Sequence, residues 1–511
     1  MEKTADLVVV GSAASGLSCA VKARQLGVKN VIVLEKMPDT GGCSKFAGQI
    51  NGFDTPVQKR QGMYYSADDG FRDLMHVLNW NADAKLVRKW ICGTGENIRW
   101  LEELGVVFSG VSAMNDRPDK HRLLMHSVPR EPGTGKHTGY RIIEALLAHC
   151  DKLGVEILTN TRAQHLIKDE KTGAITGVIA GSPDGELVVR AKAVMLGTGS
   201  ICGNQDMIKR FYNSDEYKDI KIQMNFPHNT GDGITMAEEA GGAAGRINTV
   251  FIGPHNHFKG ASEIVGAVTR RSHGIKVNKL GERFHDESLP SEAEFNWMAC
   301  VNIDRQPGKI CYNIIDQSIL DRMIEHRRDK VYMVDFGAIS GNEIVTFGDA
   351  DAPPDLNDPT SWILHFNDAI KREEAADRAK VCASIEEIAE YIGCGPETLS
   401  ETLVNYNDSC EKKYDYEFLK APEYLLPLTQ PPYYVTNGPS GIDCCIGGLS
   451  VNNHQSVIDK DGMPLRGLYA GGVLTSGWLN GLYGYWGSEM SYSVFSGRNA
   501  AAEISGYISK V

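Results

Sequence analysis

Near its start the chain reads Asp6-Leu-Val-Val-Val-Gly11-Ser-Ala-Ala-Ser-Gly16-Leu17, and it continues to Val31-Ile-Val-Leu-Glu35. This pattern indicates a strand–helix–strand unit. It consists of two apolar runs, a glycine turn, a helical stretch from about Ser15 to Gln25 and a final acidic residue. Gly11 permits the tight turn, and Gly16 lets the helix pack close to the strand. This order of elements predicts an α/β fold that binds a dinucleotide.

The residues of this unit have expected roles toward the dinucleotide. Ala13 stands where the motif has its second glycine, at the point where backbone approaches a pyrophosphate. Ala14 and Ser15 lie at the start of the helix, whose N-terminal amides attract phosphate. Glu35 ends the second strand, where its carboxylate can accept hydrogen bonds from a ribose diol, and Lys36 follows it.

A second glycine turn indicates FAD rather than NAD. It comprises Gly41, Gly42, Cys43 and Ser44. Two later stretches also read as a strand followed by a glycine turn and resemble those that close over FAD in flavoproteins with two dinucleotide folds: Val194-Met-Leu-Gly-Thr198-Gly199 and Gly467-Leu-Tyr-Ala-Gly471-Gly472. One glycine turn alone could be a plain strand-to-helix corner, but four in this order favour an FAD-binding protein.

Composition excludes several other classes of protein. A chain of 511 residues that is 42% hydrophobic can form a large core, and its length suggests two to four domains. The net charge is −12, and the sequence has no cluster of basic residues. Neither nucleic acid nor an anionic membrane surface is therefore an expected partner. No apolar run approaches the ~20 residues that span a bilayer. The first glycine motif begins at residue 11, so we expect no signal peptide or transit segment before the fold.

The cysteines point to a reducing compartment. The twelve cysteines are scattered without any Cys-x-x-Cys spacing, and only Cys444 and Cys445 are adjacent. Neither an iron–sulfur site nor a disulfide framework is therefore expected, and no metal site is assigned. The simplest expectation is a cytoplasmic protein.

The remaining motifs complete a resemblance to a known family. They are Thr230-Gly-Asp232-Gly233, Val277-Asn278, Gly281-Glu-Arg-Phe284 and Gly447-Gly448. With the glycine turns, they resemble the fumarate reductase/succinate dehydrogenase-type flavoproteins, a family that also holds urocanate reductase and the 3-ketosteroid dehydrogenases. The resemblance covers the whole chain. It implies a Rossmann-like FAD-binding domain made of residues 1–251 and 438–511, with an α+β capping domain inserted at residues 252–437.

The resemblance also implies how FAD is held. Gly48 and Gln49 would pass under the flavin ring, and Ala163 would flank the adenine end. Asp232, Cys444 and Gly472 belong to further stretches expected to contact FAD. Members that attach FAD covalently use a histidine close to Ser44, and no histidine lies between Gly41 and Gly52. We therefore expect noncovalent FAD.

The last helix has its own expected role. Gly487-Ser488-Glu489-Met490-Ser491 opens an apolar helix that runs through Ile504, and Ser488 is a suitable N-cap. Pointed at the flavin C2 carbonyl, the partial positive charge of the helix N-terminus would stabilise the anionic reduced flavin. Ser488, Glu489 and Met490 are thus expected to contact FAD.

The chain departs from the dicarboxylate reductases of this family at the substrate. Those enzymes grip fumarate with arginines and histidines, because a dianion needs cationic partners. Here the proton-donating arginine falls near Leu320, the clamping arginine falls at Gly484, and the histidine pair becomes Asp443-Cys444. Fumarate would meet Asp443 where it needs a cation, so we do not expect it to be the substrate.

Aromatic residues stand where the cationic clamp is missing. Aromatic side chains that line a substrate site, here called the aromatic wall, suit a neutral or ring-shaped conjugated substrate. The same residues could instead pack in the protein core. They are Trp478, Tyr483, Tyr485 and Trp486, with Tyr433 and Tyr434 upstream. For proton transfer we favour Tyr485 or Tyr483. Arg270 and His255 are the alternatives, and both also fit an ordinary surface role.

These observations predict an FAD-dependent oxidoreductase that acts on a CH–CH bond. Hydride would pass between FAD N5 and a carbon β to an activating carbonyl or carboxyl, most simply to reduce an enone or enoate. Electrons would come from an external donor such as a reduced flavin, a ferredoxin-like protein or a reductase. Three alternatives stay open: a 3-ketosteroid-type dehydrogenase running oxidatively, an electron-transfer flavoprotein subunit, and a redox-neutral hydratase or isomerase that keeps FAD structurally.

Overall fold

The computed structural model describes residues 1–113, 124–129, 131, 136–212, 227–252, 262–269, 273–288, 298–325, 339–340, 343–344, 359–479 and 487–511. Within it the chain forms two compact units. The first is made of Met1–Asp219, Met224–Val250 and Cys444–Val511, and the second of Ile220–Gln223 and Phe251–Asp443. Both ends of the chain therefore belong to the first unit.

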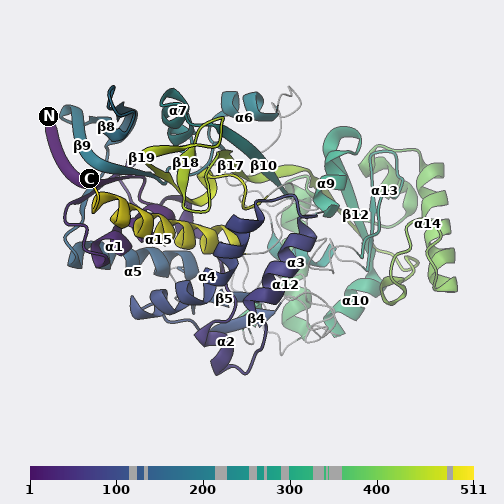
Figure 1. Cartoon of the computed structure of the whole chain (residues 1–511). Coiled ribbons are helices and arrows are strands. Elements are labelled where there is room, and N and C mark those ends of the chain that lie inside the picture. Colours follow the sequence, from purple (N-terminus) through teal and green to yellow (C-terminus); the bar gives the residue numbers. More distant parts are fainter. Residues whose placement is uncertain are drawn as a thin grey trace. The chain divides into compact units, whose positions relative to one another are not determined.

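A mostly parallel sheet is the centre of the first unit (Figure 1). Its strand order is β18-β19-β9-β1-β2-β6, and β7 and β8 extend it from β9 as antiparallel strands. The neighbours β19, β9, β1, β2 and β6 run parallel. The strands are β1 (Glu2–Val10), β2 (Val31–Leu34), β6 (Glu156–Leu158), β7 (Arg162–Lys168), β8 (Ile175–Ser182), β9 (Gly185–Leu196), β18 (Ser456–Ile458) and β19 (Pro464–Ala470). The apolar end of β1 and all of β2 are buried, as expected for parallel strands covered on both faces.

The first and last helices pack against each other. Helix α1 (Ala14–Gln25) confirms the predicted helix, and α15 (Ser488–Ile508) lies beside it (Figure 1). A Cβ on Gly497 would lie only 2.2 Å from the carbonyl oxygen of Ser15, so only glycine allows this approach. The C-terminal helix is therefore part of the same layer as the N-terminal dinucleotide unit.

The other elements of the first unit surround this layer. The predicted helical region from Ala67 to Leu104 is two helices, because Asn79 and Trp80 adopt left-handed backbone with φ of 50° and 55°. The α-helices are α2 (Pro56–Arg60), α3 (Ala67–Val77), α4 (Ala84–Glu103), α5 (Thr138–Lys152), α6 (Gln205–Tyr212) and α7 (Asp232–Glu239). A small antiparallel sheet has the order β3-β5-β4, from β3 (Ile50–Asn51), β4 (Gly110–Ala113) and β5 (Leu124–Ser127). The 3₁₀ helices are η1 (Gly42–Phe46) and η6 (Gly472–Leu474).

The second unit is built on an antiparallel sheet of order β11-β12-β16-β15. Its strands are β11 (Ile275–Val277), β12 (Ile310–Asp316), β15 (Ala379–Cys382) and β16 (Tyr433–Pro439). Its helices are α8 (Glu263–Thr269), α9 (Met298–Asp304), η4 (Pro307–Lys309), α10 (Gln317–Glu325), α12 (Pro359–Ala375), α13 (Ile385–Ile392), α14 (Pro396–Lys412) and η5 (Pro422–Tyr424). Two sheets of two strands each complete the list. One pairs β13 (Ile339–Ser340) with β14 (Glu343–Ile344), and the other pairs β10 (Ala244–Ile252) with β17 (Gly441–Leu449). The boundary between the two units falls inside β10 and β17.

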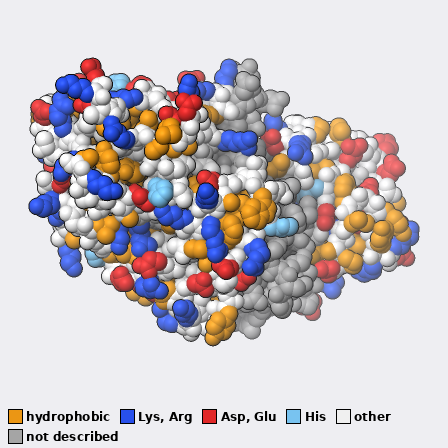
Figure 2. Space-filling view, in the orientation of Figure 1, with side chains coloured by type: hydrophobic (Ala, Val, Ile, Leu, Met, Phe, Trp, Pro, Cys, Tyr) orange, Lys and Arg blue, Asp and Glu red, His pale blue; other side chains and the backbone are white. Residues whose placement is uncertain are grey.

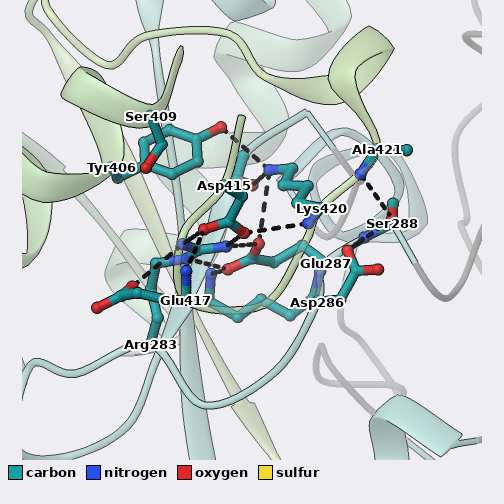
Figure 3. Close-up of polar contacts among 12 residues, drawn as sticks. Arg283, Asp286, Glu287, Ser288, Tyr406, Ser409, Asp415, Glu417, Lys420 and Ala421 are labelled. Atoms are coloured by element: carbon teal, nitrogen blue, oxygen red, sulfur yellow. Dashed lines mark hydrogen bonds and ion pairs between the residues drawn. The ribbon is translucent and has the colours of Figure 1, made fainter. Parts of the chain in front are cut away.

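A buried charge network holds the second unit together (Figure 3). Arg283 lies in the motif Gly281-Glu-Arg-Phe284 and donates to the carboxylates of Glu287 (2.7 and 2.9 Å) and Asp415 (2.9 and 3.1 Å). The Lys420 ammonium donates to the Tyr406 hydroxyl at 3.0 Å and lies 3.6 Å from Glu287. The side chains of Arg283, Glu287 and Asp415 are at most 1% exposed. Breaking such a network by removing one partner typically costs about 3–5 kcal/mol, so this family motif has a structural role here.

The network also changes protonation. Burial alone would raise the pKa of Glu287, but the charges of Lys420 and Arg283 hold that pKa well below its usual range. Burial lowers the pKa of Lys420 to about 8, against the attraction of Glu287. The carboxylate therefore stays ionised as the partner that the buried guanidinium requires.

The visible surface mixes charges of both signs. Figure 2 shows Lys and Arg side chains interspersed with Asp and Glu over the described part of the face in view. Among the residues that the structure describes, no helix is both long and apolar enough to cross a membrane.

Candidate functional site

The first glycine turn brings three stretches of main chain together. Gly11 has a φ of 98°, and a Cβ there would lie 2.5 Å from the carbonyl oxygen of Gly197. A Cβ on Gly16 would lie 2.0 Å from the carbonyl oxygen of Gly11. Both positions therefore require glycine, as the motif predicts, and the end of β9 lies directly against the turn.

Glu35 organises this turn from the end of β2. Its Oε2 accepts hydrogen bonds from the main-chain N–H of Ser12 at 3.0 Å and from the Ser12 hydroxyl at 2.6 Å. Its Oε1 accepts from the N–H of Met37 at 2.9 Å. Sequence reasoning missed these bonds, although a hydroxyl inside the glycine motif was a signal for them. A carboxylate has about four acceptor positions, so the predicted ribose contact of Glu35 stays a prediction that these bonds permit.

The second glycine turn packs on the first. The N–H of Gly41 donates to the Ser12 carbonyl at 3.1 Å and to its hydroxyl at 3.2 Å, and the N–H of Ala14 donates to the Ser44 hydroxyl at 3.1 Å. A Cβ on Gly42 would lie 3.7 Å from that of Ala13. The structure thus brings together the two predicted cofactor-binding turns.

A charge cluster joins two other predicted cofactor residues, Lys36 and Asp232. The Lys36 ammonium lies 3.1 Å from the Asp232 carboxylate, which also accepts from the Arg162 guanidinium at 2.9 and 3.1 Å. Ala163, next to Arg162 in β7, is 5% exposed. Burial alone would raise the pKa of Asp232, but its bond from Arg162 and the charge of Lys36 lower it. Asp232 is therefore an anion that orients Lys36.

Gly472 joins the C-terminal part of the unit to α1. It has a φ of 72°, and a Cβ there would lie 2.8 Å from the Ser15 hydroxyl oxygen. Its N–H donates to the Ser496 hydroxyl of α15 at 2.8 Å. Gly199, at the turn after β9, has a φ of 78°. These contacts gather the late glycine turns around the start of α1.

The N-terminus of α15 corrects one prediction. The N-cap is Gly487, with a φ of 78°, and Ser488 is already the first helical residue. Ser488 was wrongly predicted as the N-cap because a flexible glycine and a small hydroxyl were adjacent, and the glycine took the left-handed position. The Gly487 carbonyl accepts from the N–H of Asn51 at 3.2 Å. This bond brings the segment after Gly48 and Gln49 to the helix start.

Predicted cofactor residues also meet at the first turn of α15. The Cys444 thiol donates to the Glu489 carboxylate at 2.7 Å, and burial raises the pKa of Glu489 against the effect of this bond. Met490 is 3% exposed. Elsewhere in the unit, the Asn229 amide donates to the sulfur of Cys43 at 3.2 Å.

These residues fit FAD. Three polar atoms in this region are buried, and within the part of the chain that the structure describes they have no hydrogen-bond partner: Ser488 Oγ, Thr198 Oγ1 and Asn51 Oδ1. Buried polar atoms are rarely left unsatisfied in proteins. A cofactor rich in hydroxyl, phosphate and ring nitrogen atoms would satisfy such atoms, and the glycine turns leave its phosphates an approach to main-chain amides.

The predicted aromatic wall is partly wrong. The Trp478 side chain has no exposed surface, stacks on Tyr492 at 4.3 Å between ring centroids and donates to the Thr475 carbonyl at 2.9 Å. Tyr433 and Tyr434 are 7% and 6% exposed and belong to the core of the second unit. Glycine-rich local sequence suggested exposure for Trp478, but tertiary packing buried it. These three side chains therefore pack in cores and do not line an open wall.

The remaining predicted site residues are not described. Tyr483, Tyr485, Arg270 and His255 lie outside the described residues. Asp443 lies in β17, and the structure does not describe its side chain. Their roles stay predictions.

Comparison with known proteins identifies the class. The family model described as an FAD binding domain matches residues 6–488, and the chain belongs to this family. It is 28% identical to the vinyl phenol reductase of Lactiplantibacillus plantarum over 516 residues, which cover 98% of this chain and 96% of that one. It is 27% identical to the urocanate reductase of Eggerthella lenta over 474 residues, covering 91% of this chain and 69% of that one. The predicted membership of the fumarate reductase-like flavoproteins, which are oxidoreductases, is confirmed.

Solved structures confirm the fold class. The 3-ketosteroid-Δ4-(5α)-dehydrogenase of Rhodococcus jostii aligns with a TM-score of 0.73 at 22% identity, covering 98% of this chain and 97% of that one. An open flavocytochrome c3 fumarate reductase aligns with a TM-score of 0.68 at 23% identity, covering 99% of this chain and 79% of that one. At these identities the likeness concerns the fold alone.

The first prediction concerns Glu35. Replacing it by Gln removes a charged acceptor for Ser12 and Met37 and for the ribose, and a charge-assisted hydrogen bond contributes about 1.5–3 kcal/mol. FAD affinity, measured by titrating FAD into the cofactor-free protein, should fall about ten- to a hundredfold. The matched control Glu156→Gln removes an exposed carboxylate from neighbouring β6 and should leave the affinity unchanged. Unchanged affinity in Glu35→Gln would place Glu35 away from the ribose.

Proposed function

We propose that this protein reduces an activated carbon–carbon double bond in a ring-bearing substrate other than fumarate. The observation that carries the proposal is the similarity to vinyl phenol reductase, which extends over nearly the full length of both chains. A vinyl phenol is an aromatic, conjugated alkene, the type of substrate for which an uncharged site is suited. The urocanate reductase similarity also concerns a protein whose named substrate carries a ring.

The missing cationic clamp supports a substrate other than fumarate. By resemblance, Leu320 stands near the proton-donating arginine of the dicarboxylate reductases, and Gly484 stands at their clamping arginine. Leu320 is 4% exposed on α10, in the apolar core of the second unit. Desolvating a dianion without these cations is strongly disfavoured.

The proposed chemistry assigns the proton to a phenol. FAD, when bound, supplies the hydride that is added to the carbon β to the activating group. Tyr485 or Tyr483 donates the proton at the other carbon, because a phenol with a pKa near 10 is protonated at neutral pH. Arg270 and His255 are the alternative donors. With Trp478 in the core, the proposed substrate wall is formed by Tyr483, Tyr485 and Trp486.

We also propose that FAD is held noncovalently. No histidine lies between Gly41 and Gly52, and the Ser44 hydroxyl accepts a hydrogen bond from the N–H of Ala14 at the start of α1. Acid precipitation of the yellow protein should release all of its flavin as FAD into the supernatant. Flavin that stays with the pellet would refute noncovalent binding.

The proposed electron donor is external. The sequence has no Cys-x-x-Cys motif, so reducing equivalents come from a reduced flavin, a ferredoxin-like protein or a reductase. The eleven cysteines whose side chains the structure describes are outside disulfides. The proposed location is the cytoplasm, because the cysteine spacing in the sequence is not that of a disulfide framework.

The substrate is tested with enzyme that has been photoreduced without oxygen, because this bypasses the unknown donor. A vinyl phenol, urocanate, ring-bearing enones, acrylate and fumarate are added separately, and flavin reoxidation is followed by absorbance. We expect a ring-bearing substrate to reoxidise the flavin and fumarate to leave it reduced. Saturable fumarate reduction at or above about 10 s⁻¹, a typical enzyme turnover, would contradict the proposal. Conversion of a substrate without flavin reoxidation would favour the hydratase or isomerase alternative.

The proton donor is tested with Tyr483→Phe and Tyr485→Phe. If one phenol carries the proton, its Phe variant should reoxidise about 10²–10⁴-fold more slowly in stopped flow, with unchanged FAD affinity. Tyr469→Phe, a buried tyrosine of β19, is the matched control and should react at the wild-type rate. Wild-type rates in both variants would exclude the tyrosines and leave Arg270 and His255 to be tested.

A further inference from the structure

The fold gathers four cysteines that are far apart in the sequence. Cys43 follows the second glycine turn, Cys202 follows β9, and Cys444 and Cys445 lie in β17. Cys43 interacts electrostatically with both Cys202 and Glu489, and the Cys444 thiol contacts Glu489 at 2.7 Å. All of these residues belong to the first unit. Neither the FAD site nor the proposed reduction uses the pair Cys202 and Cys445.

Cys202 has the surroundings of a nucleophilic sulfur. The main-chain N–H of Cys445 donates to its Sγ at 3.1 Å, and the Ser200 hydroxyl lies 3.2 Å from the same atom. Donors aimed at a sulfur stabilise its thiolate, which is the reactive form. The 3.1 Å contact between the Cys445 main chain and the Cys202 sulfur brings the two residues side by side, which a disulfide requires.

Protonation distinguishes Cys202 from other buried thiols of the chain. Burial raises the pKa of Cys43 and of Cys150 to about 12 in each case. The hydrogen bonds from Cys445 instead lower the pKa of Cys202, against the effects of its burial and of the Glu489 charge. A thiol with a lowered pKa beside a second cysteine is the arrangement that forms and breaks disulfides.

Metal binding is the other common use of clustered thiols. Across the described ranges, no group of three or more His, Cys, Asp or Glu side chains is arranged to hold a metal ion. Redox chemistry of the thiols is therefore the better supported use.

We propose that Cys202 and Cys445 are a peroxide-sensitive dithiol that closes reversibly to a disulfide. The Cys202 thiolate attacks one oxygen of hydrogen peroxide, the O–O bond breaks, and hydroxide leaves, which gives a sulfenic acid at Cys202. The Cys445 thiol then forms the S–S bond and releases water. The two cysteines lose two electrons in total, and peroxide is reduced to two molecules of water once the hydroxide is protonated. Exchange with two equivalents of a small thiol, which are oxidised to a disulfide, restores the dithiol.

The burial of the two thiols favours a small oxidant. Cys202 and Cys445 are 2% and 1% exposed, so a bulky disulfide reagent has little access to them. Hydrogen peroxide is scarcely larger than water. The bond would tie the loop after β9 to β17 across 243 residues of sequence, which constrains the unfolded chain more than the folded one. The proposal does not depend on the proposed substrate.

The proposal is tested on the complete FAD-containing protein. Protein kept reduced is treated with hydrogen peroxide, denatured in an alkylating reagent and mapped by peptide mass spectrometry. We expect one peptide pair joined through Cys202, lighter by two hydrogen atoms than the separate peptides and restored by dithiothreitol. Denaturant resistance of the oxidised protein should also rise. Equal alkylation of Cys202, Cys445 and Cys150 after treatment would overturn the proposal.

Single variants assign the bond, because Cys444 and Cys445 share a peptide. Cys444→Ser should keep the cross-link, whereas Cys445→Ser should lose it and leave a sulfenic acid at Cys202 that dimedone labels. Cys150→Ser, a buried thiol of α5, is the matched control and should behave as wild type. A cross-link lost in Cys444→Ser but kept in Cys445→Ser would contradict the pairing. If a variant fails to fold, fragment ions of the wild-type cross-linked peptide distinguish Cys444 from Cys445 directly.

Discussion

The main chain of Gly11 lies against the carbonyl of Gly197, and that of Gly497 lies against the carbonyl of Ser15. A Cβ at either glycine would come within 2.5 Å of a main-chain oxygen, which no local adjustment of a side chain relieves. The contact at Gly11 joins the dinucleotide turn to β9, and the contact at Gly497 joins helix α15 to helix α1. Through these two contacts, segments from both ends of the chain form one cofactor-binding unit.

The charges of the site depend on this scaffold. Because β1 and β2 are neighbouring parallel strands, Ser12 can reach the Glu35 carboxylate, and where the two glycine turns meet the N–H of Ala14 reaches Ser44. A carboxylate that is already held by Ser12 and Met37 presents its remaining acceptor positions in a fixed direction, so little conformational freedom is lost when a ligand binds. The Lys36 ammonium is oriented in the same way by Asp232.

The sequence was sufficient for features that depend on local chemistry. Gly11 and Gly16 were predicted because backbone geometry admits no other residue there, and the helix that follows was correct to within one residue. Features that depend on tertiary contact were missed. Trp478 was assigned to a wall from its glycine-rich neighbourhood, but its ring packs against Tyr492 in the core. The contact between Cys202 and Cys445 joins residues 243 positions apart, which no spacing pattern reveals.

The most direct test of this account is hydrogen–deuterium exchange of the cofactor-free protein before and after FAD is added. A unit built from both ends of the chain predicts that FAD protects residues 11–16, 41–44 and 487–491 together. Exchange rates in the charge network around Arg283, in the second unit, should change less. Protection confined to the two N-terminal glycine turns, with no change at the start of α15, would contradict a cofactor site shared by both ends of the chain.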